Sequence, residues 1–143
     1  MTSDPYGDNK QCSVLVVNCT GRQTAHSQSL QLRGFRVIEV SEWPTDEMVL
    51  EHEVVIIVLR RMDSVSMTAA RMRAKPRFGS RILVGVTESA PSAGERRLAI
   101  VSGFDDIVGE SGDSRVLIAR ILRVLRTRPE HRCLVPDKKR PAA

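Results

Sequence analysis

The residues best suited to chemistry follow the first apolar run of the chain. Cys19 and Thr20 come directly after Ser13–Asn18 and before a segment that can form a helix. Backbone amides at such a junction can hold an anion and lower the pKa of a thiol. This favours one alternative, a phosphate-loop enzyme or carrier that uses Cys19. Against it, the segment 19–24 has too few glycines for a phosphate-binding fingerprint, and a buried structural cysteine is the commoner outcome.

The cysteines and histidines predict neither a metal site nor a disulfide framework. Cys12, Cys19 and Cys133 are scattered, and no Cys/His pattern has the spacing of metal ligands. The three histidines lie far apart and have no neighbour at catalytic spacing. Free thiols suit a reducing cytoplasm, where we expect the protein to be. No apolar stretch approaches the roughly 18 residues of a membrane span.

The basic charge leaves a second alternative open. The net charge is +5, and much of the excess lies in the last predicted helix and in residues 129–143. This region could bind nucleic acid or an acidic partner through its charge alone. Aromatic residues make up only 3% of the chain, so none are interleaved for base stacking. A solvated charged surface is the better interpretation, and nucleic acid is an unexpected partner.

Any site must be positioned by the apolar strand Glu53–Leu59. Six of its seven residues are branched aliphatics without alternation, which is typical of a central parallel strand covered on both faces. Ligands of such sheets collect outside the carboxyl ends of the central strands. No acidic residue occurs between Val54 and Met62, so this strand end offers no carboxylate.

Apolar runs and turn residues predict five strands alternating with five helices. The expected strands are 13–18, 35–40, 53–59, 81–87 and 104–108. The expected helices are 20–33, 45–51, 63–75, 95–101 and 113–128, four of them capped by Thr20, Thr45, Asp63 and Asp113. Apolar spacing predicts inward faces that carry Ala25, Ser29 and Leu32 in the first helix, Met62, Val65, Ala69 and Met72 in the third, Leu98 and Val101 in the fourth, and Leu117, Ile118, Ile121, Leu122 and Leu125 in the fifth.

This order of elements predicts an α/β fold. We expect a three-layer flavodoxin-like (βα)5 sandwich with right-handed crossovers. The expected parallel strand order is 2-1-3-4-5, because the first, third and fourth strands are the most apolar and hence central. Residues 1–11 are predicted to be a flexible leader, 12–128 one domain and 129–143 a basic, disordered tail.

Four segments in order along the chain resemble the receiver domains of two-component response regulators. They are Val14–Val17, Leu32–Val37, Ile82–Thr87 and Gly103–Val108, the last of which is similar to the family's GADDYL segment. The resemblance covers about residues 13 to 128. It implies the flavodoxin-like fold and a role in phosphorelay signalling, in which a histidine kinase phosphorylates an aspartate at the end of the third strand.

The resemblance also assigns the positions of the phosphorylation site, and most carry the wrong chemistry. The acidic pair that binds Mg²⁺ falls on Asn18 and Cys19, and the phosphoacceptor falls on Val58. The conserved lysine of the family falls on Glu110, which would repel a phosphoryl group. The aromatic switch residue falls on Ile107, and only the hydroxyl is kept, as Thr87.

The resemblance therefore implies a degenerate pseudo-receiver that is not an enzyme, needs no cofactor and binds no Mg²⁺. We expect it to act in signalling through protein–protein interaction, with a homodimer as one form of that interaction. The family's common interaction face, made of the fourth helix, fifth strand and fifth helix, would carry mixed charge suited to salt bridges. Its candidate residues are Arg96, Arg97, Asp105, Asp106, Arg115, Arg120, Arg123 and Arg126.

Overall fold

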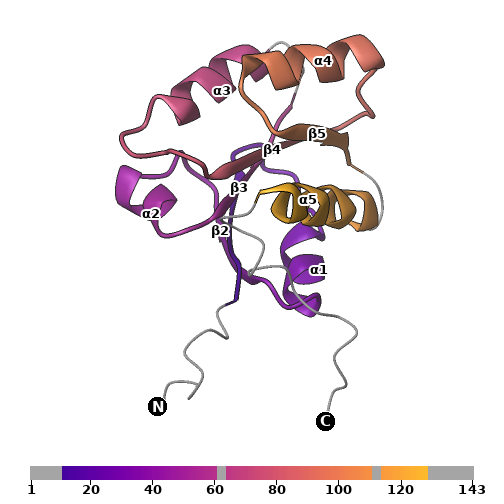
Figure 1. Cartoon of the computed structure of the whole chain (residues 1–143). Helices are drawn as coiled ribbons and strands as arrows, with labels where there is room; N and C mark the ends of the chain where they lie inside the picture. The colour runs from indigo at the N-terminus through magenta and orange to yellow at the C-terminus, as the bar shows by residue number, and fades with distance from the viewer. Residues whose placement is uncertain (1–10, 61–63, 111–113, 129–143) are drawn as a thin grey trace, which may run out of the picture.

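The computed structural model describes residues 11–60, 64–110 and 114–128. Strands and helices alternate along these residues, as predicted (Figure 1). The strands are β1 (Ser13–Asn18), β2 (Arg36–Val40), β3 (Val54–Val58), β4 (Ile82–Thr87) and β5 (Asp106–Gly109). The helices are α1 (His26–Leu32), α2 (Asp46–Leu50), α3 (Val65–Arg73), α4 (Ala93–Ser102) and α5 (Arg115–Thr127).

All five strands join one parallel sheet in the order β2-β1-β3-β4-β5, which confirms the predicted topology. The register places Asn18 beside Val58, Val58 beside Val86, and Thr87 beside Gly109. The carboxyl ends of β1, β3, β4 and β5 therefore meet along one edge of the sheet. This edge is where the predicted site residues come together.

Both faces of the sheet are buried under helices. Successive side chains of each strand point to opposite faces of the sheet and form two clusters. One cluster lies under α1 and α5 and contains Val58; the other lies under α2, α3 and α4 and contains Ile57 (Figure 1). Every residue of β3 is buried, as its unbroken apolar run predicted. Full burial of each such side chain contributes about 1.5–3 kcal/mol, so these two clusters hold the strand ends in place.

The first helix begins later than predicted. α1 starts at His26 after Ala25, because the hydroxyl of Thr20 is used in the preceding loop and caps no helix. Its buried residues are His26 and Leu30, whereas Leu32 is 80% exposed. The predicted inward position of Leu32 is therefore wrong, since a helix that begins at His26 turns a different face to the sheet.

The fourth helix also buries a different face from the one predicted. α4 is capped by Ser92 in a capping box with Glu95, and Ala99 is its buried residue. Leu98 and Val101, expected to point inward, are 50% and 78% exposed. α4 lies close to α3, and a Cβ at Gly103 would lie only 3.4 Å from the Cβ of Ala69. Small residues make this contact, so the larger apolar ones remain outside.

The other helices largely follow the predictions. Thr45 caps α2 by accepting a hydrogen bond from the amide of Met48, as expected. The buried residues of α5 are the five that were predicted, and α3 buries Val65, Ala69 and Met72. Met62 and the proposed caps Asp63 and Asp113 lie outside the described residues. None of the helices in the described ranges is long and apolar enough to cross a membrane.

Candidate functional site

The loop after β1 is closed around Asn18. The side-chain oxygen of Asn18 accepts hydrogen bonds from the amide of Thr20 at 3.1 Å and from its hydroxyl at 2.6 Å. The side-chain amide of Asn18 donates to the carbonyl of Arg22 at 2.7 Å, and the hydroxyl of Thr20 accepts from the amide of Arg22. The polar atoms of Asn18 are thus satisfied within its own loop, which leaves no free oxygen for a hard cation.

This loop carries Arg22 across the end of the sheet. Nη1 of Arg22 lies 3.0 Å from Oε1 of Glu110 and 3.8 Å from Oε2 of Glu88. Nη2 donates to the carbonyl oxygen of Leu59 at 3.3 Å. The guanidinium therefore connects the ends of β3, β4 and β5. Glu110, predicted to repel a phosphoryl group, forms an ion pair inside the chain.

The remaining site positions are apolar or satisfied locally. Val58 is 4% exposed and packs in the α1/α5 cluster. The hydroxyl of Thr87 has two backbone acceptors, Ser89 O at 2.6 Å and Val108 O at 3.3 Å. Ile107 is 1% exposed on the other face of the sheet. Thr87 therefore closes a strand end, and Ile107 has no polar tip that could exchange between buried and exposed states.

We expect the Arg22–Glu110 pair to couple measurably. Both side chains are partly buried, at 28% and 21% exposed, so their attraction is only partly screened. In a double-mutant cycle with Arg22→Met and Glu110→Gln, the coupling energy should be about 1 kcal/mol and should shrink at high salt. Urea denaturation measures it. The Arg22–Glu88 pair, whose atoms lie 3.8 Å apart and whose carboxylate is 68% exposed, serves as the control and should give a smaller value; equal values would contradict this assignment.

Two histidines are buried. His26 lies next to this region, and His52 lies before β3, at the opposite end of the sheet. His26 is 2% exposed, and its Nδ1 lies 2.7 Å from the hydroxyl of Ser114 at the start of α5. Burial lowers the pKa of His26, although the charges of Glu110 and Glu39 oppose that shift. Burial likewise lowers the pKa of His52. The His26–Ser114 hydrogen bond joins the start of α1 to the start of α5, and within the described ranges no carboxylate is hydrogen-bonded to either imidazole.

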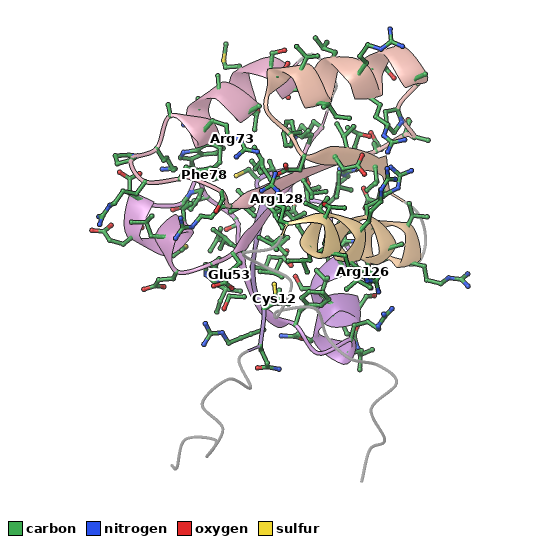
Figure 2. All side chains as sticks on the ribbon, viewed as in Figure 1. Cys12, Glu53, Arg73, Phe78, Arg126 and Arg128 are labelled. Carbon is green, nitrogen blue, oxygen red and sulfur yellow. The ribbon has the colours of Figure 1, made fainter. Side chains whose placement is uncertain are left out.

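The two described cysteines have opposite environments. Cys12 is buried, and burial together with the charge of Glu53 raises the pKa of its thiol to about 12 (Figure 2). Cys19 is exposed, so the expectation of a buried structural cysteine is wrong for this residue. The helix that follows begins only at His26, which places Cys19 away from a helix N-terminus. The anion-binding junction, which was one alternative for Cys19, is therefore not formed.

Asp106 lies at the centre of the predicted interaction face. Its carboxylate, 6% exposed, accepts from Nε of Arg96 at 3.1 Å and from Nη1 of Arg120 at 2.8 Å. It also accepts from the amide of Ile107 at 2.8 Å. Burial alone would raise the pKa of Asp106, but the hydrogen bonds from Arg120 and Ile107 and the charge of Arg120 hold it below its usual value. Asp106 thus joins α4 and α5 to β5.

Asp105 makes a second junction, between α3 and the end of α5. One of its oxygens accepts from Nη2 of Arg73 at 3.1 Å and from the amide of Leu83 at 2.7 Å. The other is ion-paired with Arg128. The guanidinium of Arg73 also lies over the ring of Phe78, 4.9 Å from its centroid. Both aspartates of the predicted face are therefore engaged within the chain.

The exposed part of this face is basic and apolar. Arg97, Arg123 and Arg126 are exposed and form no ion pair with any carboxylate that the structure describes, and Arg115 is exposed as well. Ile100 and Arg123 line one groove between α4 and α5. The apolar side chains exposed here are Leu98, Ile100, Val101 and Val116.

Two further sequence predictions concern metal ions and nucleic acid. Within the described ranges, no group of three or more His, Cys, Asp or Glu side chains could hold a metal ion. The basic residues of the tail, 129–143, lie outside the described residues, so nucleic-acid binding through them stays a prediction. The sequence did not predict a role for Arg22. Its place four residues after Asn18 can be read from the sequence, but its ion pair with Glu110 depends on the tertiary structure.

No protein-family model matches the chain, and neither does any curated protein. Solved structures do match. An orphan response regulator of H. pylori is 20% identical with a TM-score of 0.57, over 80% of this chain and 97% of its own. An atypical orphan response regulator with a phosphorylation-independent regulatory mechanism is 18% identical with a TM-score of 0.61, over 80% and 95%.

A third similar structure is the chemotaxis protein CheY4 of Vibrio cholerae. It is 18% identical with a TM-score of 0.58, over 81% of this chain and all of its own, 100%. At such identities the likeness concerns the fold, and it agrees with the observed strand order. The chain has the flavodoxin-like fold of response-regulator receiver domains, as its sequence predicted.

Proposed function

We propose that the chain is a phosphorylation-independent receiver-like signalling module and not an enzyme. One observation carries the proposal: the Arg22–Glu110 ion pair crosses the sheet edge above Val58, where a receiver needs a carboxylate nucleophile. A phosphoryl group there would find no attacking oxygen at Val58 and would meet the carboxylate of Glu110. The guanidinium of Arg22, paired with Glu110 and hydrogen-bonded to the carbonyl of Leu59, supplies a positive charge at this edge from within the chain.

Acetyl phosphate and Mg²⁺ should leave the protein unchanged. We expect no gain of a phosphate mass in intact-protein mass spectrometry, because no carboxylate occurs between Val54 and Met62. We also expect the thermal unfolding midpoint to stay constant in millimolar Mg²⁺, since only binding to the folded state would raise it. A receiver with an intact aspartate is the positive control. A phosphate mapped to the β1, β3 or β5 strand end would contradict the proposal.

The module would act through protein contacts on the α4–β5–α5 face. Its aspartates are used inside the chain, and the exposed charged groups that the structure describes on α4 and α5 include Arg97, Arg123 and Arg126 alongside the carboxylate of Glu95. Apolar side chains on α4 and α5 lie beside these arginines and could be buried on binding. A protein surface with acidic groups around an apolar centre fits this pattern. In a homodimer, the apolar side chains would make the central contact and the arginines would have to lie at its solvated rim.

Changing Val101 to Glu should weaken self-association by about tenfold or more, because it puts a charge at an apolar contact. Sedimentation velocity over a range of concentrations measures the effect. Leu32→Glu is the matched control: Leu32 is equally exposed, at 80%, but lies on α1 on the other side of the sheet. Equal effects of the two variants would contradict this face, and a wild-type chain that stays monomeric would exclude the homodimer.

A further inference from the structure

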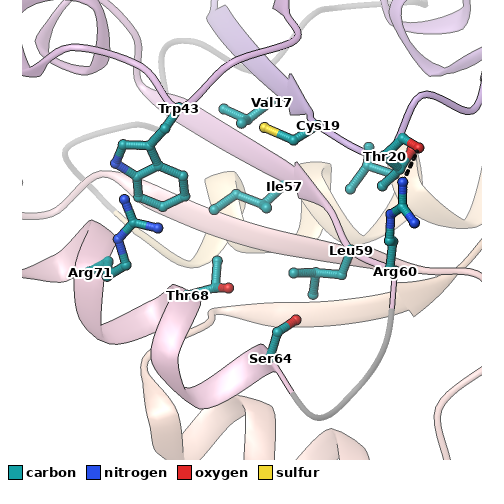
Figure 3. Close-up of a pocket in the computed structure, with 11 residues that line it drawn as sticks. Val17, Cys19, Thr20, Trp43, Ile57, Leu59, Arg60, Ser64, Thr68 and Arg71 are labelled. Atoms are coloured by element: carbon teal, nitrogen blue, oxygen red, sulfur yellow. Dashed lines mark hydrogen bonds between the residues drawn. The ribbon is translucent and has the colours of Figure 1, made fainter.

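A cavity of about 310 Å³ lies at the carboxyl ends of β1 and β3, on the side of the sheet covered by α3 (Figure 3). It is separate from the Arg22–Glu110 pair, and neither of those residues lines it. The strand order β2-β1-β3 places the cavity at the switch point of the sheet, where chain connections run in opposite directions from β1 and β3. Open α/β sheets bind their ligands at such a point.

The floor of the cavity is apolar. Val17, Ile57 and Leu59 are all 5% exposed or less, and their side chains belong to the cluster under α2, α3 and α4. The indole of Trp43, from the loop after β2, forms one side wall (Figure 3). Cys19 and Thr20 border the cavity from the loop after β1. An apolar body of a ligand could be covered on several sides.

The wall formed by α3 is polar, because the polar residues of this helix that line the cavity share one face. Ser64, Thr68 and Arg71 are four and three residues apart, so they lie on one face of α3 and its cap. The guanidinium of Arg71 lies over the Trp43 ring, 4.1 Å from its centroid. Arg60 stands at the rim, held by a hydrogen bond of 2.9 Å from its Nη2 to the carbonyl of Thr20.

The charge of this wall has no counter-charge among the residues that the structure describes. None of the described residues that line the cavity is an aspartate or a glutamate. Neither Arg60 nor Arg71 forms an ion pair with a carboxylate in the part of the chain that the structure describes. Lys75, the other cation near Trp43 at 5.9 Å, differs because it is paired with Asp46 at 2.8 Å. The cavity therefore combines an apolar floor with two cations that are not ion-paired within residues 11–60, 64–110 and 114–128.

We propose that this cavity binds a small organic anion, a carboxylate on an aromatic body. The body would rest on Ile57 and Leu59 beside Trp43, and the carboxylate would accept hydrogen bonds from Arg71 or Arg60. An inorganic anion would leave the apolar floor uncovered, and a neutral aromatic molecule would leave the guanidinium groups without a partner. The binding is non-covalent, and it does not depend on the function proposed above.

Trp43 provides a direct measurement, because it is the only tryptophan of the chain. In a ¹H–¹⁵N NMR spectrum of the full chain its indole N–H gives a single peak. Titration with 2-naphthoate should shift that peak with saturation. The neutral isostere 2-naphthamide should bind at least about tenfold more weakly, because it lacks the charge-assisted hydrogen bond. Inorganic phosphate should also bind at least about tenfold more weakly, because it has no ring to bury on the apolar floor.

Arg71→Met should weaken binding of 2-naphthoate by about tenfold, since it keeps much of the contact with Trp43 and loses the charge. Arg71 is exposed, so this variant should fold; Arg60→Met is the second variant and should weaken binding as well. Arg126→Met, on the distant α5, is the matched control and should bind like the wild type. Equal binding of naphthoate and naphthamide, equal binding of phosphate, or unchanged binding by both Arg71→Met and Arg60→Met would overturn the proposal.

Discussion

Asp106→Asn should lower the free energy of unfolding by about 3 kcal/mol, among the largest effects expected of a polar substitution in this chain. The carboxylate is 6% exposed and accepts from Arg96, Arg120 and the amide of Ile107. An asparagine would keep one acceptor and turn an N–H₂ group toward a guanidinium. Both arginines retain partial contact with water, at 35% and 27% exposed, which keeps the loss below that of a fully buried pair. Urea denaturation with an unchanged m-value measures it.

The effect of Asp106→Asn should depend on pH in one direction. The pKa of Asp106 is held below its usual value in the folded state, so its ionised form stabilises the fold. This contribution is present above the unfolded pKa of about 3.9 and is lost as pH falls through the lower folded pKa. The stability difference between wild type and variant should therefore close in acid. Asp46→Asn, at a half-exposed carboxylate, is the control; a gap that stays constant in acid would contradict the assigned role.

Gly109→Ala should destabilise the fold by about 2 kcal/mol, because the site has no room for a methyl group. A Cβ at Gly109 would lie 2.5 Å from Cα and 2.7 Å from N of Ala90, and both are backbone atoms of the loop after β4. That loop would have to move away from the end of β5, next to Glu110. Thermal or urea denaturation gives the value.

Gly94→Ala is a control with the opposite expected sign. Gly94 lies in the first turn of α4, and a Cβ there meets nothing within 4 Å. Alanine in place of glycine in a helix should stabilise the chain by about 0.5–1 kcal/mol. If both variants destabilise equally, the loss at Gly109 does not come from contact with Ala90.

The fold was predictable because the signal lies in continuous apolar runs. β1, β3 and β4 are buried at every residue, and such strands can only be central in a parallel sheet. Short helices carry less information. In α4 the spacing of Leu98 and Val101 fits an inward stripe, yet the contact with α3 is made through Ala99 and Gly103, where small size decides. Helix capping was equally ambiguous at Thr20, whose hydroxyl completes a turn with Asn18.

The sequence predicts which groups of the phosphorylation site are missing, but it does not predict the contacts that form in their place. The absence of a carboxylate at Val58 follows from the sequence alone. The Arg22–Glu110 pair does not, because those residues lie in loops at opposite ends of the chain and meet only after the sheet has formed. For the same reason the sequence suggested that Asp105 and Asp106 were available to a partner, whereas neighbouring helices supply arginines to both.

The two edges of the sheet limit how copies of this chain can aggregate. β2, at one edge, exposes Arg36 and Glu39, and Glu39 is hydrogen-bonded to Ser27 on α1. β5, at the other edge, is only four residues long. Charged or very short edge strands resist the strand-to-strand addition that leads to amyloid-like fibres. Concentrated samples should therefore form no cross-β fibres. Any ordered assembly of the chain should form through its helical surfaces.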